Sequence, residues 1–174
     1  MPSRRRLLAA LGTTAAGALA GCSASDATTG VVARKDVTVA VPQDVGDPVD
    51  TTVAFLAFES ESRLVHGEYA HVAGAAVDGA TIAVSEQLHE RLSDRFTAVR
   101  YTTDVVPADG SKPADGAVDR WAFNDLSVGG TATVESSVGD AGRGRLRLRE
   151  TTARERDPAE ITVSAYDLEA RLDG

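Results

Sequence analysis

The chain has few cysteines, lysines and aromatic residues, and it lacks the common catalytic motifs. Cys22 is the only cysteine among 174 residues, so no disulfide can form within the chain. A folded domain must then be held together by a packed core. Lys35 and Lys112 are the only lysines, and the other basic residues are arginine. No GxSxG, Walker or dinucleotide-binding motif occurs, so no motif points to a catalytic centre and we expect no cofactor.

Long apolar runs are also scarce. The longest apolar run is Leu7 to Ala20, which has 14 residues and carries no charge. As a helix it would extend about 21 Å, short of the roughly 30 Å hydrocarbon core of a bilayer. It follows three arginines, Arg4, Arg5 and Arg6, and it ends in small residues. This order is typical of an export signal, so we assign residues 1–21 to a signal peptide.

Two short motifs in this segment carry a family resemblance. The residues SRRRLL, from Ser3 to Leu8, resemble a twin-arginine export motif. The residues LAGC, from Leu19 to Cys22, resemble the lipobox of lipoproteins. The resemblance implies cleavage before Cys22 and lipid attachment to its thiol. Because a single acyl chain binds membranes only marginally, it also implies a second lipid chain. An ordinary signal peptide with an incidental cysteine is the alternative.

Acidic residues outnumber basic residues in the chain. The chain has 26 acidic and 18 basic residues, a net charge of −8. Removing the three arginines of the signal leaves 15 basic residues and a net charge of 15 − 26 = −11. This balance is similar to that of proteins from halophilic archaea, in which molar salt screens self-repulsion. An acidic protein from another habitat is the alternative. Binding to nucleic acid is disfavoured.

Three parts follow from these patterns. Residues 1–21 form the signal peptide, residues 22–30 form a lipidated cysteine with a flexible tether, and residues 31–174 form a single globular β-rich domain. The expected location is the outer face of the cell membrane, with the lipid on Cys22 as the anchor.

Hydrophobic alternation predicts mostly strands in the domain. The clearest helix is Ser85 to Phe96, in which Leu88, Leu92 and Phe96 share a face and Ser85 can cap the N-terminus. Residues 64–77 fit a strand or a helix about equally well. Strands are expected at 31–41, 51–58, 80–84, 97–106, 117–128, 131–138, 145–151 and 161–172, the last with a bulge or a change to helix near Tyr166.

The predicted fold class is α+β, a mainly antiparallel sheet packed by one or two helices. A β-sandwich carrying one helix is the alternative. Trp121 and Phe123 lie in the strand expected at 117–128, and we expect both in the core.

His66, Glu68 and His71 are weak candidates for a metal site. On a strand His66 and Glu68 would share a face, whereas His71 would point the other way. On a helix the two histidines would lie about 140° apart. Neither arrangement matches the HExxH spacing of metalloproteases, so no metal is expected.

A second candidate is an alternating stripe formed by Arg143, Arg145, Arg147 and Arg149. On a strand the four guanidinium groups would share one face, suited to an anion or a protein partner. The alternative is a solvent-facing strand whose arginines pair with acids such as Glu135 across a hairpin.

Together these patterns predict a membrane-anchored extracytoplasmic lipoprotein with a binding or accessory domain. Two alternatives remain open. One is a tethered hydrolase-like enzyme that uses His66, Glu68 or His71, and the other is an assembly subunit that docks a protein partner through Arg143–Arg149.

Overall fold

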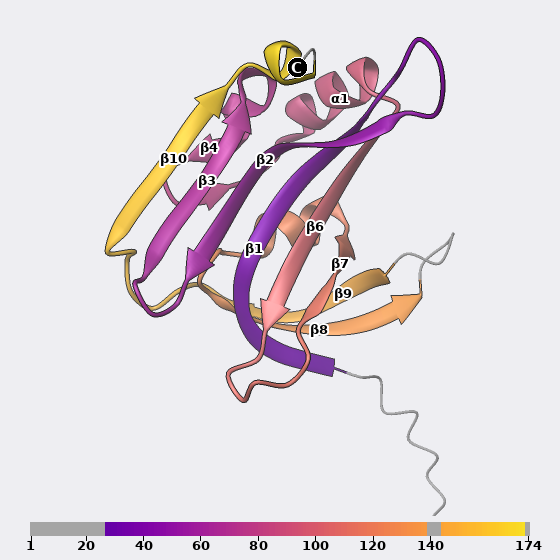
Figure 1. The fold of residues 1–174 in the computed structure, drawn as a ribbon. Helices are drawn as coiled ribbons and strands as arrows, with labels where there is room; N and C mark the ends of the chain where they lie inside the picture. The colour runs from indigo at the N-terminus through magenta and orange to yellow at the C-terminus, as the bar shows by residue number, and fades with distance from the viewer. Residues whose placement is uncertain (1–26, 139–143, 173–174) are drawn as a thin grey trace, which may run out of the picture.

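Eight strands join in one continuous sheet in the computed structural model, which describes residues 27–138 and 144–172 (Figure 1). The strand order is β10-β3-β2-β1-β6-β7-β9-β8. In chain order the bounds are β1 (Ala27–Val41), β2 (Val49–Glu59), β3 (Leu64–Ala70), β6 (Ala98–Val106), β7 (Ala114–Val118), β8 (Thr131–Val138), β9 (Gly144–Thr152) and β10 (Glu160–Tyr166). Two further short strands, β4 (Val77–Asp78) and β5 (Thr81–Ile82), pair with each other.

The long strand β1 organises this sheet because it pairs with three other strands. It runs antiparallel to β2 on one side and to β6 on the other, and its first residues, Ala27–Val31, pair with β8. Register shifts at Val32/Arg34 and Val37/Thr38 interrupt its ladders, and such irregularities let a strand bend. Strand β6 pairs with β7, β7 with β9, β9 with β8, and β8 with the start of β1. These five strands therefore form a closed circuit.

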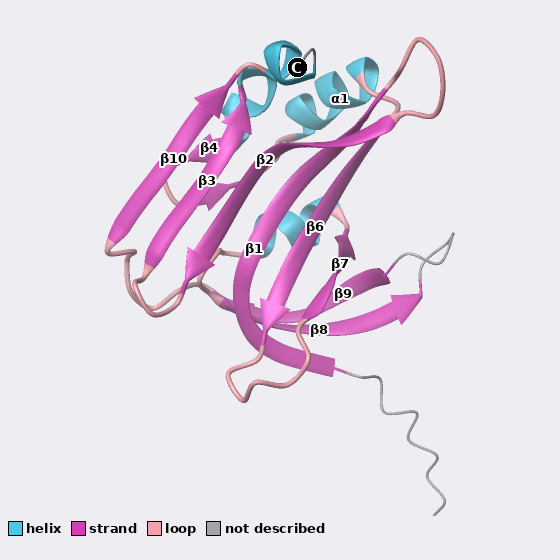
Figure 2. Ribbon diagram, viewed as in Figure 1, coloured by secondary structure: helices cyan, strands magenta, loops and turns pink. Residues whose placement is uncertain are grey.

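Three of the four described helices lie on one face of the sheet, and the fourth, which follows β10, lies at the end of the sheet. The four are the 3-10 helix η1 (His71–Ala76) and the α-helices α1 (Glu86–Arg95), α2 (Arg120–Asp125) and α3 (Leu168–Leu172). Figure 2 shows α1 and α2 behind β1, β2 and β6. None of the helices within the described residues is long and apolar enough to span a membrane.

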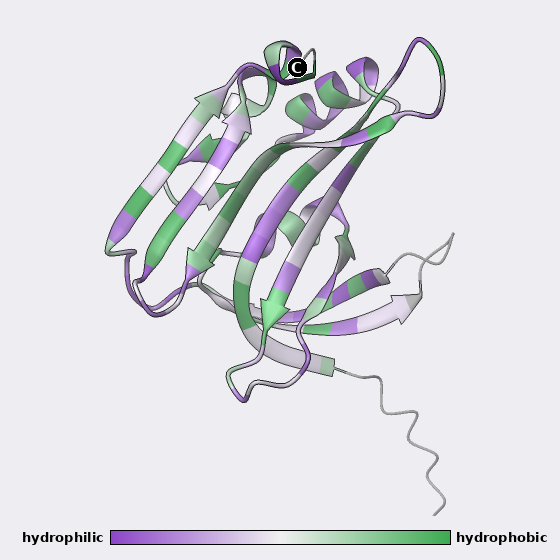
Figure 3. Ribbon diagram, in the orientation of Figure 1, coloured by the Kyte–Doolittle hydropathy of each residue, from purple (hydrophilic) through white to green (hydrophobic). Residues whose placement is uncertain are grey.

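The core lies between the helices and this face. Val37 and Val39 point into it from β1, and Leu88 and Leu92 point into it from α1. Hydrophobic and polar residues alternate along β10, as Figure 3 shows, because successive side chains of a strand point to opposite faces. The Ser85 hydroxyl accepts a hydrogen bond from the Leu88 N–H at 3.2 Å and caps α1.

The structure confirms the broad prediction of a β-rich α+β chain and adds one detail to it. The sheet is mixed, since β10 runs parallel to β3 and β7 makes one parallel bridge to β9. After β9 the chain crosses to the far edge of the sheet and enters it at the end where β3 begins, with Glu160 opposite Leu64.

The strand expected at 117–128 is wrong. A short strand, β7, ends at Val118, and α2 follows, capped by the Asp119 carboxylate, which accepts the Ala122 N–H at 2.8 Å. On a strand Trp121 and Phe123 would share a face, whereas on a helix they lie about 200° apart. Phe123 is accordingly buried, and Trp121 is 69% exposed, contrary to the expectation of a core position.

Other boundaries agree more closely. Residues 64–70 are extended and residues 71–76 form η1. The expected change to helix near Tyr166 is confirmed by α3. The strand β1 begins at Ala27, so four residues expected in the tether belong to the sheet. The signal segment, Cys22 and Arg143 lie outside the described residues.

Candidate functional site: an arginine-lined pocket and two charged faces

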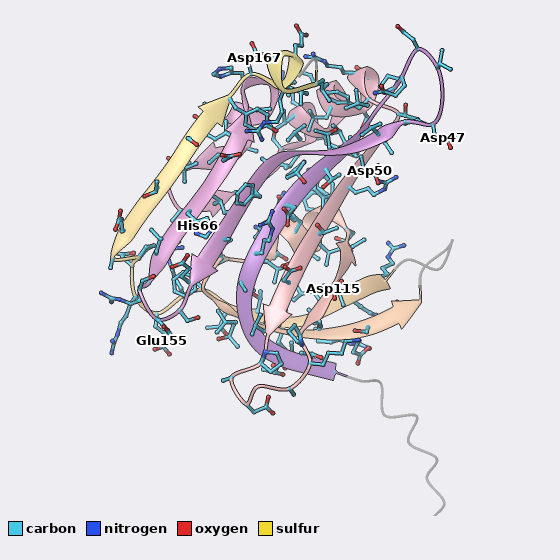
Figure 4. All side chains as sticks on the ribbon, in the orientation of Figure 1. Asp47, Asp50, His66, Asp115, Glu155 and Asp167 are labelled. Carbon is cyan, nitrogen blue, oxygen red and sulfur yellow. The ribbon has the colours of Figure 1, made fainter. Side chains whose placement is uncertain are left out.

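His66 lies on the face of the sheet opposite the helices, in the middle of β3 (Figure 4). Its Nδ1 atom is 3.7 Å from a carboxylate oxygen of Glu59, and its ring meets the ring of Phe55 edge-on at 6.3 Å between centroids. The strand places Glu68 on the same face, as expected for residues two apart.

The metal candidates do not converge. Arg171 of α3 pairs with Glu68 at 3.1 Å and stacks on the ring of Tyr166, with its guanidinium carbon 3.6 Å from the centroid. His71 is the first residue of η1 and has left the strand. Within the described residues, no three His, Cys, Asp or Glu side chains are grouped to hold a metal ion.

A charged cluster on this open face was not predicted. The Nε and Nη2 atoms of Arg34 donate to the Asp36 carboxylate at 2.7–2.9 Å, and the guanidinium lies over the ring of Phe55, 4.2 Å from its centroid. Asp104 lies opposite Arg34 on β6. Burial, followed by the nearby Asp36 charge, raises the pKa of Asp104. Arg34, Lys35 and Asp36 are three consecutive charged residues, so no alternation in the sequence indicated this cluster.

The arginine stripe on β9 has the predicted geometry. Arg145, Arg147 and Arg149 are exposed, whereas Leu146 between them is buried. Arg149 forms an ion pair with Glu135 across the hairpin, as the alternative interpretation expected. In the described part of the chain, Arg145 and Arg147 have no carboxylate within ion-pair distance.

The side chain of Lys35 lies in the core. It is 1% exposed, and its ammonium group donates to the backbone oxygens of Ile82 at 2.8 Å and Leu126 at 2.6 Å. The ammonium also lies 4.3 Å from the ring centroid of Phe123. Desolvation lowers the pKa of Lys35 to about 7, partly opposed by the charge of Asp125.

Aromatic contacts extend from Lys35 to α1. The rings of Phe123 and Tyr101 are 5.1 Å apart, and the Tyr101 hydroxyl is 2.8 Å from Nδ1 of His89. Burial raises the pKa of Tyr101 to about 12. This chain of contacts links α2, the sheet and α1, so we assign it to holding the core together.

An open pocket of about 380 Å³ lies beside the β2–β3 hairpin. A second pocket of about 220 Å³ adjoins it and shares the residues Ala153 and Arg154. Three arginines line the larger pocket, Arg63, Arg154 and Arg156, and Glu155 is its only acidic residue.

Residues 153–158 are rich in charge, but no motif in the sequence assigns them a role. The signal for the pocket was weak because Arg63 lies about ninety positions before its neighbours. Only the folded chain brings the β2–β3 hairpin beside the segment between β9 and β10, where the Arg63 carbonyl accepts the Ala159 N–H at 2.9 Å.

Comparison of the chain with protein-family models, with curated proteins and with solved structures gave no match.

Proposed function

We propose that this protein is a lipid-anchored extracytoplasmic lipoprotein whose folded body is a binding or accessory module. The single observation that supports this most is the position of β1. The central strand of the sheet begins at Ala27, five residues after Cys22. At about 3.3–3.6 Å per extended residue, that link spans at most about 18 Å.

This proximity has a physical consequence for the body. A lipid on Cys22 would hold the β8–β9 end of the sheet near the membrane surface, because Ala27 pairs with Glu135 of β8. The pocket lined by Arg63, Arg154 and Arg156 would remain open to solvent for a ligand. Anchoring of this kind restricts a binding module to the cell surface without any contact between its fold and the hydrocarbon.

The test is replacement of the thiol. We expect Cys22→Ser to prevent lipidation, so that the protein appears in the medium or stays unprocessed. Fractionation of cells and mass spectrometry of the purified N-terminus measure both outcomes. Ser25→Ala, in the same short segment, should stay in the membrane fraction with a lipidated N-terminus. Membrane retention and normal processing of Cys22→Ser would contradict the proposal.

A second candidate function is docking of a protein partner through the Arg143–Arg149 strand. The favouring observation is that Arg145 and Arg147 are exposed and have no carboxylate partner within the described residues, although the chain is rich in acids. Unpaired guanidinium groups on one face suit an acidic partner surface.

A further inference from the structure

We propose that the pocket lined by Arg63, Arg154 and Arg156 binds a small organic oxyanion that carries at least two negative charges, such as a phosphate monoester. The proposal rests on the proposed binding function and gives it a site and a ligand class. It does not depend on the lipid anchor.

Three separate segments form the pocket. The β2–β3 hairpin contributes Phe58 and Arg63, the turn before β8 contributes Gly129–Thr131, and the connection after β9 contributes Thr152–Arg156. Figure 4 shows Glu155 at this end of the molecule, close to the β2–β3 hairpin. Long-range folding therefore assembles the site.

Positive charge exceeds negative charge in the lining of this pocket, which has three arginines and one glutamate. Six other arginines of the described chain pair with carboxylates: Arg34, Arg95, Arg100, Arg120, Arg149 and Arg171. No ion pair within the described residues involves Arg63, Arg154 or Arg156. Neighbouring like charges repel each other, and a bound anion would offset that repulsion.

Arg154 is held in place before any ligand arrives. Its Nη1 atom donates to the backbone oxygen of Val128 at 3.1 Å and, more weakly, to that of Ala80 at 3.4 Å. Both bonds use Nη1, which leaves the N–H groups of Nε and Nη2 for another acceptor. Guanidinium N–H pairs match phosphate and carboxylate oxygens in a bidentate geometry.

Arg63 is held in a less common backbone conformation. Its φ of 52° is the only positive φ at a residue other than glycine in the described chain. Side chains larger than hydrogen disfavour this region, and such residues gather at functional sites. The hydrogen bond from the Ala159 N–H to the Arg63 carbonyl fixes the hairpin against the segment that carries Arg154 and Arg156.

Size and lining favour an organic ligand over a bare ion. The volume of about 380 Å³ lies within the range of small-molecule sites, roughly 300–1,000 Å³. The ring of Phe58 forms an apolar wall that lies so close to Gly129 that a Cβ there would be 3.1 Å from it. An anionic group at the arginines would place the organic part of the ligand against this ring.

The experiment is calorimetric titration of the full-length protein in detergent with phenyl phosphate and, separately, with inorganic phosphate. We expect phenyl phosphate to bind more tightly than phosphate, and the affinity to fall as chloride is added. The double variant Arg63→Gln/Arg156→Gln should weaken binding about tenfold or more, since it removes two charge-assisted contacts.

The matched control is Arg91→Gln/Lys112→Gln, which removes the same charge from two exposed residues that lie outside the pocket. We expect its affinity to stay within about twofold of wild type, because a remote exposed charge contributes little. Equal weakening in both double variants, or no binding by the wild-type protein, would overturn the proposal. Cys22→Ser should bind phenyl phosphate normally, so failure of the anchor and failure of this site can be told apart.

Discussion

At the scale of single residues, Lys35 has an uncommon environment, because lysine side chains are seldom fully buried in proteins. Its ammonium group has two backbone oxygens and one aromatic ring around it, and no carboxylate within the described residues forms an ion pair with it. Removing an ammonium group from water is costly, and the hydrogen bonds offset only part of that cost. The lowered pKa of Lys35 expresses the remainder.

We predict that this lysine makes stability depend on pH. Its pKa is about 7 in the folded protein and 10.5 as the ordinary value. Between these values the unfolded chain binds more protons, so the free energy of unfolding should rise with pH. Relative to Lys35→Met, the wild-type protein should gain about 2 kcal/mol between pH 7 and pH 9. Urea unfolding at several pH values measures the difference.

Lys112 provides the control for this prediction because it is the only other lysine and is exposed. Lys112→Met should leave the pH profile of the wild-type protein unchanged. If Lys35→Met and the wild-type protein gave parallel profiles from pH 7 to pH 9, Lys35 would keep its ordinary pKa in the folded state, and its assignment to a desolvated core position would fail.

At the scale of elements, the pairing of β2 with β3 depends on Gly67. This residue lies opposite Leu56, and a Cβ on it would be 2.1 Å from the backbone oxygen of Phe55 and 2.7 Å from a methyl group of Leu56. The two strands can approach this closely only because glycine has no side chain.

We predict that Gly67→Ala destabilises the protein by about 3 kcal/mol or more, since a backbone atom cannot move aside as a flexible side chain can. Gly144→Ala at the start of β9 is the matched control, because its Cβ would meet only the Asp115 carbonyl oxygen at 3.4 Å, an ordinary contact. Urea midpoints compare the two variants. Similar losses in both would show that the close approach at Gly67 is not what matters.

The strands and helices differed in how well local patterns predicted them. The helix α1 followed from its cap and its apolar stripe, both of which involve residues within twelve positions of each other. The helix α2 did not, because the short run of Trp121, Ala122 and Phe123 is compatible with the period of a strand and with that of a helix, until packing in the core selects one. The burial of Phe123 against Lys35 and Tyr101 made that selection.

At the scale of the whole molecule, excess negative charge is the dominant feature. The chain has 26 acidic and 18 basic residues, and removal of the expected signal would raise the imbalance to −11. Self-repulsion of this kind opposes the compact state and weakens as salt shortens the Debye length from about 10 Å at 0.1 M to about 3 Å at 1 M.

We predict that the melting temperature rises as sodium chloride is increased from 0.1 M to 2 M. A variant with Glu61→Gln, Glu90→Gln and Asp94→Asn tests the cause, because all three residues are exposed. Its melting temperature should be higher at 0.1 M salt and should rise less with added salt. An equal rise in both proteins, measured by circular dichroism, would assign the effect to general strengthening of apolar burial by salt.

The sequence alone determined the features that depend on neighbours along the chain: the signal and lipobox resemblance before Ser23, the acidic balance, the helix α1, and the alternating arginines of β9. Each of these is a matter of composition or of a short periodic pattern. The resemblance and the anchor it implies stay predictions, since they lie outside the described residues.

Only the tertiary structure decided the features that join distant segments. It paired β8 with the start of β1 and placed β10 parallel to β3. It also buried Lys35 and brought Arg63 to the same pocket as Arg154. No local pattern specifies these, because the free energy that selects them comes from apolar burial and backbone pairing between residues many positions apart.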